Sequence, residues 1–370
     1  MLLTLLATTA MAMQSPPANA PFDMEMVVDL EHPWAMNFLP DGRMLVTEKA
    51  GQLLVVSQQG AVEMEVSGVP EVDFGGQGGL GDVILHPDFE TNGMIYISYV
   101  EAGERNRRGA AVARGTLDLT AGTLSDVEVI WRQNPKVTGR GHFGHRMRFS
   151  PDGQHLFITS GERQKFNPAQ SMKMNLGKII RLHPDGSIPE DNPFFDKGGV
   201  TAEIWTVGMR NPLGLDFDAN GVLWETEMGP LAGDEFQRIE RGKNYGYPVV
   251  SNGDHYSGRE IPDHDTRPEF RAPDEWWAPP ALSPSSLEIY EGTTFADWTG
   301  DALIGGLSSQ ALVRVTMDCD TDPDGICEEE RYEMGMRIRG VVEGPSGNVF
   351  IIEDGGSRGG DGRIFKLTPK

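Results

Sequence analysis

A strand–turn–strand pattern recurs along this chain of 370 residues, and it restricts the fold more than any other feature. Each copy has alternating apolar and polar residues, a turn that contains glycine, and a second apolar stretch. The copies begin near residues 35, 81, 146, 212, 285 and 338. Units repeated at this scale bury their apolar faces against their neighbours, typically in a radial array. The repeats therefore predict an all-β fold, a six-bladed β-propeller.

The repeats run to the C-terminus without a linker, which predicts one propeller domain over residues 21–370. Residues 1–20 are interpreted as a signal peptide, because a short apolar run is followed by small residues; a disordered leader is the alternative. The run is too short to cross a bilayer, so no membrane insertion is expected. Export would place the protein in the periplasm or outside the cell. Cys319 and Cys327 would suit a disulfide there, with two free thiols as the alternative.

The formal net charge of −23 limits the possible partners. Nucleic acid is disfavoured because phosphate binding requires a basic surface. A small anionic ligand would need a local cluster of arginines that acts against the field of the whole chain.

Large polar residues recur at one offset in the repeats, five to ten residues before the turn. If the first strand of each hairpin is the innermost of its blade, these positions meet at one mouth of the central channel. The residues concerned are Trp34, Gln77, His142, Arg146, Arg210, Asn211, Arg337 and Arg339. Converging arginine forks suit a ligand with more than one carboxylate or phosphate. The alternative is that these residues pair with acidic loops on a strongly negative protein.

His142 is the candidate general base at this mouth, because imidazole titrates near neutral pH. Glu162, at the end of the second strand of the same hairpin, could hold one ring nitrogen protonated and leave the other free to accept a proton. A structural role for His142 is the alternative. The neighbouring His145 is assigned no role.

Two acidic segments are candidates for a hard cation. Residues 225–248 combine carboxylates with Gly-Pro carbonyls, an oxygen-only set that suits Ca²⁺ rather than zinc. Residues 318–330 place aspartates at alternate positions before a glycine, as at the start of a calcium loop. The twelfth position counted from Asp320 is Arg331 rather than glutamate, so the EF-hand pattern fails. We expect an acidic surface loop there, with or without Ca²⁺.

Six segments follow one another along the chain: GGQGGLGDVILHPDF, GHFGHR, GKIIRLHPDGSIPEDNPF, AEIWTVGMRNPLGLDF, GDEFQRIERGKNYGYP and MRIRGVVEGPSGNVF. In sequence and in order they resemble segments of the soluble quinoprotein sugar dehydrogenases, the glucose/sorbosone dehydrogenase group, and most closely of the bacterial aldose sugar dehydrogenases. The resemblance runs from about Leu30 to the C-terminus. It implies a six-bladed propeller that binds pyrroloquinoline quinone (PQQ) and calcium. It also implies oxidation of an aldose sugar at the anomeric carbon to a lactone, with electrons passed to an external acceptor.

The resemblance also implies roles for individual residues. His142 would take the proton of the sugar hydroxyl, Glu162 would be its acidic partner, and Arg210 would polarise the quinone carbonyl. The residues implied to contact PQQ are Gln77, Arg146, Arg210, Asn211, Arg337 and Arg339. The residues implied to hold calcium are Gly229 and Pro230, through backbone carbonyls at the quinone, and Glu235 and Tyr245, at a second ion.

One position departs from the family pattern. Characterised members place a lysine on the cofactor after a GGL turn, whereas this chain has Ser308 in GGLSSQ. A charge-assisted contact of this kind contributes about 1.5–3 kcal/mol, which corresponds to one to two decades of affinity. Either another residue compensates, or PQQ binds more weakly, or this branch does not use PQQ.

Two other functions compete with a dehydrogenase. One is a propeller that binds a carbohydrate or another ligand without catalysis, which Ser308 favours. The other is a calcium-dependent lactonase, which would need side-chain carboxylates at the axis. The axial positions are mainly basic or amide side chains, which disfavours the lactonase. We expect a monomer or a homodimer.

Overall fold

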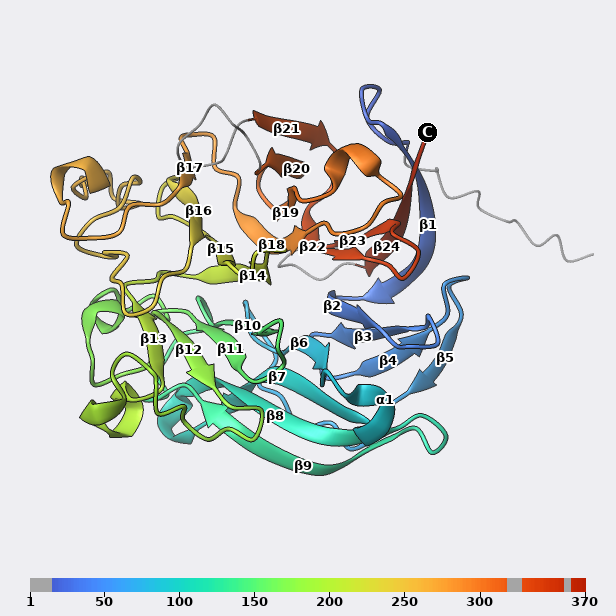
Figure 1. Ribbon diagram of the computed structural model, residues 1–370, viewed down its shortest axis with the longest axis horizontal. Coiled ribbons are helices and arrows are strands. Elements are labelled where there is room, and N and C mark those ends of the chain that lie inside the picture. Colours follow the sequence, from blue (N-terminus) through green and yellow to red (C-terminus); the bar gives the residue numbers. More distant parts are fainter. Residues whose placement is uncertain (1–14, 318–327, 356–360) are drawn as a thin grey trace, which may run out of the picture.

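The computed structural model describes residues 15–317, 328–355 and 361–370. Within these residues, six four-stranded antiparallel sheets form the blades of a ring (Figure 1). The six-bladed β-propeller predicted from the repeats is confirmed. The predictions for Cys319 and Cys327, most of the loop 318–330 and most of the leader lie outside the described residues.

Each of the first five blades uses four strands in chain order. The first three blades are β2 (Pro33–Phe38), β3 (Met44–Glu48), β4 (Leu53–Val56) and β5 (Val62–Glu65); β6 (Leu80–Leu85), β7 (Met94–Ala102), β8 (Arg108–Asp118) and β9 (Thr123–Arg132); and β10 (Gly144–Phe149), β11 (Leu156–Ser160), β12 (Lys178–Leu182) and β13 (Ile204–Val207). The next two are β14 (Pro212–Phe217), β15 (Leu223–Glu227), β16 (Asp234–Arg238) and β17 (Glu275–Trp277); and β18 (Pro284–Ile289), β19 (Ala302–Gly306), β20 (Ala311–Thr316) and β21 (Glu328–Glu333).

The sixth blade joins the two ends of the chain. It consists of β22 (Ile338–Glu343), β23 (Val349–Glu353) and β24 (Asp361–Pro369), with β1 (Phe22–Glu31) as its outermost strand. β1 pairs antiparallel with β24, so the N-terminal strand closes the ring. Closure through a strand from the other end of the chain makes the sixth sheet as wide as the others.

Helices are short and lie in the connections. They are α1 (Phe89–Asn92) and the 3₁₀ turns η1 (Glu104–Asn106), η2 (Asn167–Gln170), η3 (Phe195–Lys197), η4 (Gly199–Thr201), η5 (His264–Thr266) and η6 (Ala296–Trp298). In the part of the chain that the structure describes, no helix is long and apolar enough to cross a membrane.

The six predicted hairpins are the first two strands of the six blades. Their turns contain a glycine in the left-handed region, for example Gly42 with φ 84° and Gly153 with φ 69°, a conformation that other residues rarely adopt. The strands β2, β6, β10, β14, β18 and β22 contact one another around the centre of the ring (Figure 1). The first strand of each hairpin is thus the innermost strand of its blade, which was the condition for the recurring polar residues to meet at one mouth of the channel.

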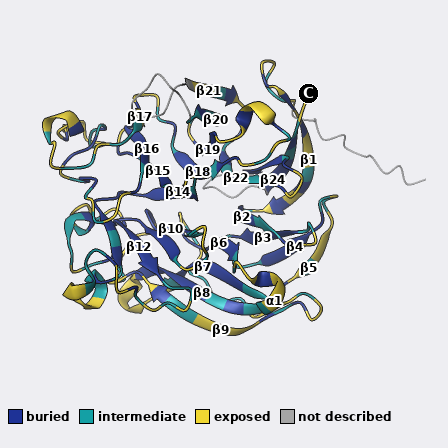
Figure 2. Ribbon diagram, in the orientation of Figure 1, coloured by how far each residue is buried: buried dark blue, intermediate teal, exposed yellow. Residues whose placement is uncertain are grey.

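The hydrophobic core lies between blades. Inner and middle strands are buried on both faces, whereas outer strands such as β5 and β9 present exposed residues (Figure 2). The cluster between the first two blades includes Leu45 of β3, Ile97 of β7 and Ala113 of β8, all fully buried. Each blade therefore buries its faces against its neighbours, which is why the repeat cannot fold as a single unit.

Candidate active site

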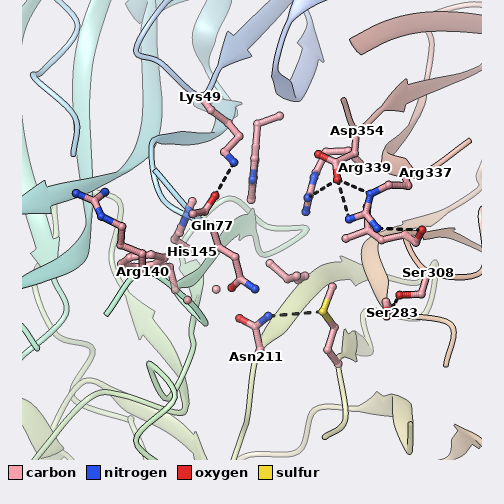
Figure 3. Close-up of a pocket in the computed structure, with 18 of the residues that line it drawn as sticks. Lys49, Gln77, Arg140, His145, Asn211, Ser283, Ser308, Arg337, Arg339 and Asp354 are labelled. Atoms are coloured by element: carbon pink, nitrogen blue, oxygen red, sulfur yellow. Dashed lines mark hydrogen bonds and ion pairs between the residues drawn. The ribbon is translucent and has the colours of Figure 1, made fainter. Parts of the chain in front are cut away.

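A cavity of about 490 Å³ lies at the axis, on the side where the innermost strands begin (Figure 3). Among the described residues that line it, the charged ones are Lys49, Arg140, Arg337, Arg339 and Asp354. Four cations and one carboxylate face this cavity, although the chain as a whole carries a net charge of −23. This is the local positive site that an anionic ligand would require.

A β-bulge at the start of each innermost strand shapes the cavity. The pairing register shifts between Pro33 and Ala35, Leu80 and Val83, Gly144 and Met147, Pro212 and Gly214, Pro284 and Ser286, and Ile338 and Gly340. A bulge releases a residue from the ladder and turns its side chain in a new direction. Among the released residues, Trp34, His145, Leu213 and Arg339 line the cavity.

Arg337 and Arg339 share one carboxylate. Nε and one terminal nitrogen of Arg337 lie 3.0 and 2.9 Å from Oδ2 of Asp354, and Arg339 lies 3.2 Å from the same oxygen. Burial acts to raise the pKa of Asp354, but the two arginines outweigh it and hold the pKa below its usual value. Two guanidinium charges therefore face the cavity with one carboxylate between them.

His142 and Glu162 form the predicted pair, with Nδ1 of His142 2.5 Å from Oε1 of Glu162. Burial lowers the pKa of His142, and Arg210 adds to this effect although Glu162 opposes it. Burial acts to raise the pKa of Glu162, but its hydrogen bond with His142 contributes to a net lowering. An ionised carboxylate can only accept, so Nδ1–H donates and Nε2 of the neutral ring keeps its lone pair. The backbone of His142 has φ 50° and donates to the Gln77 side chain at 2.6 Å.

Glu162 also holds the loop that follows it. Its two carboxylate oxygens accept backbone N–H bonds from Gln164, Lys165 and Phe166 at 2.8, 2.5 and 2.6 Å. Gln164 and Phe166 have positive φ values of 58° and 62°, which non-glycine residues rarely adopt. The carboxylate thus stabilises a strained loop and orients the histidine at the same time.

Arg210 and Asn211 are positioned by Glu227, whose Oε2 accepts both backbone N–H groups at 2.5 and 2.9 Å. The guanidinium of Arg210 donates to the Met228 carbonyl at 2.7 Å and to the Tyr256 hydroxyl at 3.3 Å. Asn211 lines the cavity, whereas Arg210 and His142 are 3% and 7% exposed and adjoin it. Nε of Arg210 and Oδ1 of Asn211 are buried and lack a partner among the described residues.

His145, which the sequence left without a role, lines the cavity. Its ring stacks on Trp34 with 5.0 Å between centroids, and its Nδ1 lies 2.8 Å from the Ser98 hydroxyl. Burial, helped by the charge of Arg146, lowers the pKa of His145 to about 3, so the ring is neutral at physiological pH. A Cβ at Gly81 would lie 2.0 Å from this ring, so glycine is required there.

Arg146, predicted to contact the cofactor, packs on Trp34, which lines the cavity. It is not among the residues that line the cavity; its guanidinium packs 4.0 Å from the ring centroid of Trp34 and lies 3.4 Å from the carboxylate of Asp82. Its remaining donors bind the backbone carbonyls of Leu213, Ser285 and Arg339. Arg146 therefore ties neighbouring blades together at the axis, and its contact with the cofactor stays a prediction.

Gly229 and Pro230, the predicted calcium ligands at the quinone, directly follow Met228, which lines the cavity. The N–H of Gly229 donates to Oδ1 of Asp234 at 2.9 Å, and a backbone carbonyl oxygen is a ligand of the kind that Ca²⁺ takes. Among the described residues, no group of three or more His, Cys, Asp or Glu side chains could hold a metal ion. A site here would therefore depend on backbone oxygens.

Glu235 and Tyr245, predicted to hold a second calcium, have other surroundings. Glu235 pairs in register with Glu227, and burial together with the neighbouring Glu227 charge raises its pKa well above the usual value. The Tyr245 hydroxyl donates to the carbonyl of Arg238 at 2.5 Å, and the Tyr245 carbonyl lies 3.0 Å from Nε2 of His264. The second ion remains a prediction from the resemblance.

Lys49 and Asp354 also belong to the site, although neither lies near the start of the first strand of a hairpin. In an antiparallel hairpin the second strand returns to the same end of the sheet. Lys49 directly follows β3 and Asp354 directly follows β23, just as Glu162 closely follows β11. The same search applied to the second strands would have found both residues.

The fold and the site together define a β-propeller with a cavity of mainly cationic lining at its axis and a buried His–Glu pair beside that cavity. A model of the Glucose / Sorbosone dehydrogenase family matches residues 30–366. The chain therefore belongs to the glucose/sorbosone dehydrogenase family.

Particular relatives agree with this assignment. The aldose sugar dehydrogenase YliI of Escherichia coli is 36% identical, over 95% of this chain and 94% of the relative. Quinoprotein glucose dehydrogenase B of Acinetobacter calcoaceticus is 27% identical, over 90% and 85%. The solved PQQ-bound aldose sugar dehydrogenase of Streptomyces coelicolor superposes with a TM-score of 0.76 at 25% identity, over 96% of this chain and all of that one.

Proposed function

We propose that this protein is a PQQ- and calcium-dependent dehydrogenase that oxidises aldose sugars at the anomeric carbon and passes the electrons to an external acceptor. The observation that carries the proposal is the buried His142–Glu162 pair beside a cavity with a cationic lining. The pair suits proton abstraction, and the lining suits a polycarboxylate cofactor. The family and the PQQ-bound relative support the same conclusion.

The residues present fit PQQ, which carries three carboxylates and two reducible carbonyls. Nε of Arg210 and Nε of Arg339 are buried and have no acceptor among the described residues. A buried donor without an acceptor costs free energy, which an oxygen of the cofactor would recover. The carbonyls of Gly229 and Pro230 would hold a calcium ion, which polarises a bound oxygen as a Lewis acid.

PQQ, when bound, supplies a quinone that accepts two electrons. The chain's own contribution is proton transfer and positioning. Nε2 of neutral His142 would accept the proton of the sugar C1 hydroxyl, while the Glu162 carboxylate stabilises the imidazolium through Nδ1–H. A hydride leaves C1 as its carbonyl forms, so the sugar loses two protons and two electrons in all and becomes a lactone. The acceptor then removes the electrons.

Reconstitution tests this function. Purified protein is mixed with PQQ and Ca²⁺, and aldose-dependent reduction of a dye is measured together with the quinone absorbance. We expect PQQ binding and sugar-dependent turnover in the wild type, and binding with a loss of turnover of at least about 100-fold in His142→Ala. Absence of PQQ binding would reject the proposal. Binding without turnover on any aldose would point instead to a propeller that binds its ligand without catalysis.

We also propose that residues 1–20 direct export to the periplasm or the cell exterior and are then removed. The apolar run followed by small residues supports this proposal. N-terminal sequencing of the protein recovered from periplasm or medium is expected to begin after the leader. An unprocessed N-terminus in the cytoplasmic fraction would contradict it.

A further inference from the structure

Lys49 is one of the cations that line the cavity. Neither the recurring positions before the turns nor the resemblance gives this lysine a role. It directly follows β3 and extends its ammonium toward the cavity, on a different side from Ser308 (Figure 3). Among the contacts of the described residues, Nζ has one hydrogen-bond acceptor, the carbonyl oxygen of Gly76 at 2.9 Å. An ammonium has three donors, so most of its capacity is left for a ligand.

The charges around Lys49 favour an incoming anion. The charged groups that act on its ammonium are Arg339, which lowers its pKa together with the larger effect of burial, and Asp354, which opposes them. Asp354 is already shared by Arg337 and Arg339. Three cations thus face one carboxylate, and a further carboxylate entering the cavity would be attracted by all three in surroundings of reduced dielectric constant.

The backbone of Lys49 is fixed. Its N–H donates to the His32 carbonyl at 3.1 Å, and its own carbonyl accepts from the N–H of Leu80 at 3.0 Å. Gly79 packs so closely that a Cβ there would lie 2.1 Å from the Lys49 carbonyl oxygen. Because the backbone of Lys49 is held from both sides, it is already positioned before a ligand binds, which reduces the entropy lost on binding.

We propose that Lys49 supplies the ammonium that contacts a carboxylate of the bound cofactor, the contact expected of a lysine at the position of Ser308. This inference rests on the proposed use of PQQ. Ser308 also lines the cavity, but its hydroxyl carries no charge and lies 2.7 Å from the hydroxyl of Ser283. In this proposal the positive charge comes from the end of β3 instead of the turn between β19 and β20.

Equilibrium binding of PQQ in the presence of Ca²⁺, followed by quenching of tryptophan fluorescence, tests this inference without reference to turnover. We expect Lys49→Met to raise the Kd for PQQ about 10- to 100-fold. Lys197→Met removes the same charge at an exposed site away from the cavity, and it is expected to leave the Kd within about twofold. Adding Ser308→Lys to Lys49→Met is expected to restore most of the lost affinity.

The outcomes separate the two proposals. A wild type that binds no PQQ rejects the proposed function and this inference together. A wild type that binds PQQ, with Lys49→Met binding equally well, rejects only the role of Lys49. Thermal unfolding of each variant without ligand checks its fold. If Lys49→Met does not fold, Lys49→Gln keeps a donor for the Gly76 carbonyl while removing the charge, and the same comparison decides.

Discussion

His142 and Glu162 act as one unit, and their electrostatics predict a pH dependence. The pKa of His142 lies below its ordinary value of 6.5, chiefly because of burial, so the ring is neutral and basic above that pH. Activity that needs the neutral ring falls as the pH drops through this lowered pKa. We therefore expect the acid limb of kcat/KM to have its midpoint below 6.5.

The Glu162→Gln variant distinguishes a role of Glu162 in orienting His142 from a role in maintaining the fold alone. The carboxylate raises the pKa of His142, so a neutral amide is expected to shift the acid limb to still lower pH. The amide of the variant would also turn N–H donors toward the backbone N–H groups whose hydrogen bonds the Glu162 carboxylate accepts. Because His142 would then be held less well, we expect the plateau of kcat to fall about 10- to 100-fold. Glu90→Gln, at an exposed position in α1, serves as the control. A lower plateau with an unmoved acid limb would mean that Glu162 only maintains the fold.

At the scale of elements, the long connection between β16 and β17 brings an aromatic residue to Arg210. Tyr256 is 73% exposed, yet its hydroxyl accepts from Arg210 and its ring lies 5.8 Å from the guanidinium carbon. Phe166, also exposed, stacks near Tyr247 from the loop that Glu162 holds. These rings form an aromatic rim next to the His–Glu pair, and we predict that a sugar bound at this pair contacts the rim.

We expect Tyr256→Ala to raise the KM for an aldose about 2- to 10-fold, the size of one aromatic contact, and to leave the Kd for PQQ within about twofold. Tyr256→Phe distinguishes the ring from the hydroxyl. Trp276→Ala removes another exposed ring, 43% exposed, at the far end of the same connection and is the matched control. Equal effects of Tyr256→Ala and Trp276→Ala on KM would show that the rim makes no specific contact with the sugar.

The sequence allowed the blades to be predicted because strand alternation and glycine turns are local signals. It also brought His142 and Glu162 together, since both belong to one hairpin. The direction of the Arg146 side chain could not be predicted for a geometric reason: the residue lies in the β-bulge of β10, where one residue of register decides which way a side chain points. Lys49 directly follows the second strand of its hairpin, so its place at the cavity could have been predicted from the repeat. The close approach of Gly79 to its backbone could not, because packing between blades has no period in the sequence.

At the scale of the whole molecule, charge is distributed unevenly by the ring. The chain carries a net charge of −23, while four cationic side chains line one cavity at the axis. The net negative charge of the whole chain would therefore repel an anionic cofactor at long range, whereas the cations of the cavity would attract it at short range. Salt screens the long-range repulsion first. The propeller makes this possible because corresponding positions of all blades converge at its axis.

Closure of the ring predicts how the molecule unfolds. Phe22 of β1 is 0% exposed and packs edge-on against Trp298 and Tyr332 of the fifth blade, with centroid distances of 5.9 and 5.3 Å. We expect Phe22→Ala to lower the free energy of unfolding by about 3–5 kcal/mol, whereas Met26→Ala, 41% exposed in the same strand, should change it by less than about 0.5 kcal/mol.

Chemical denaturation followed by circular dichroism and by tryptophan fluorescence measures both the size of this loss and its cooperativity. Because β1 pairs with β24 and also packs on the neighbouring blade, its loss should weaken the ring as a whole. Both probes should then shift together to lower denaturant concentration in one transition. An early, separate transition confined to one probe in Phe22→Ala would mean that the last blade unfolds independently. In that case β1 would cover the edge of the sixth blade without making the unfolding of the ring cooperative.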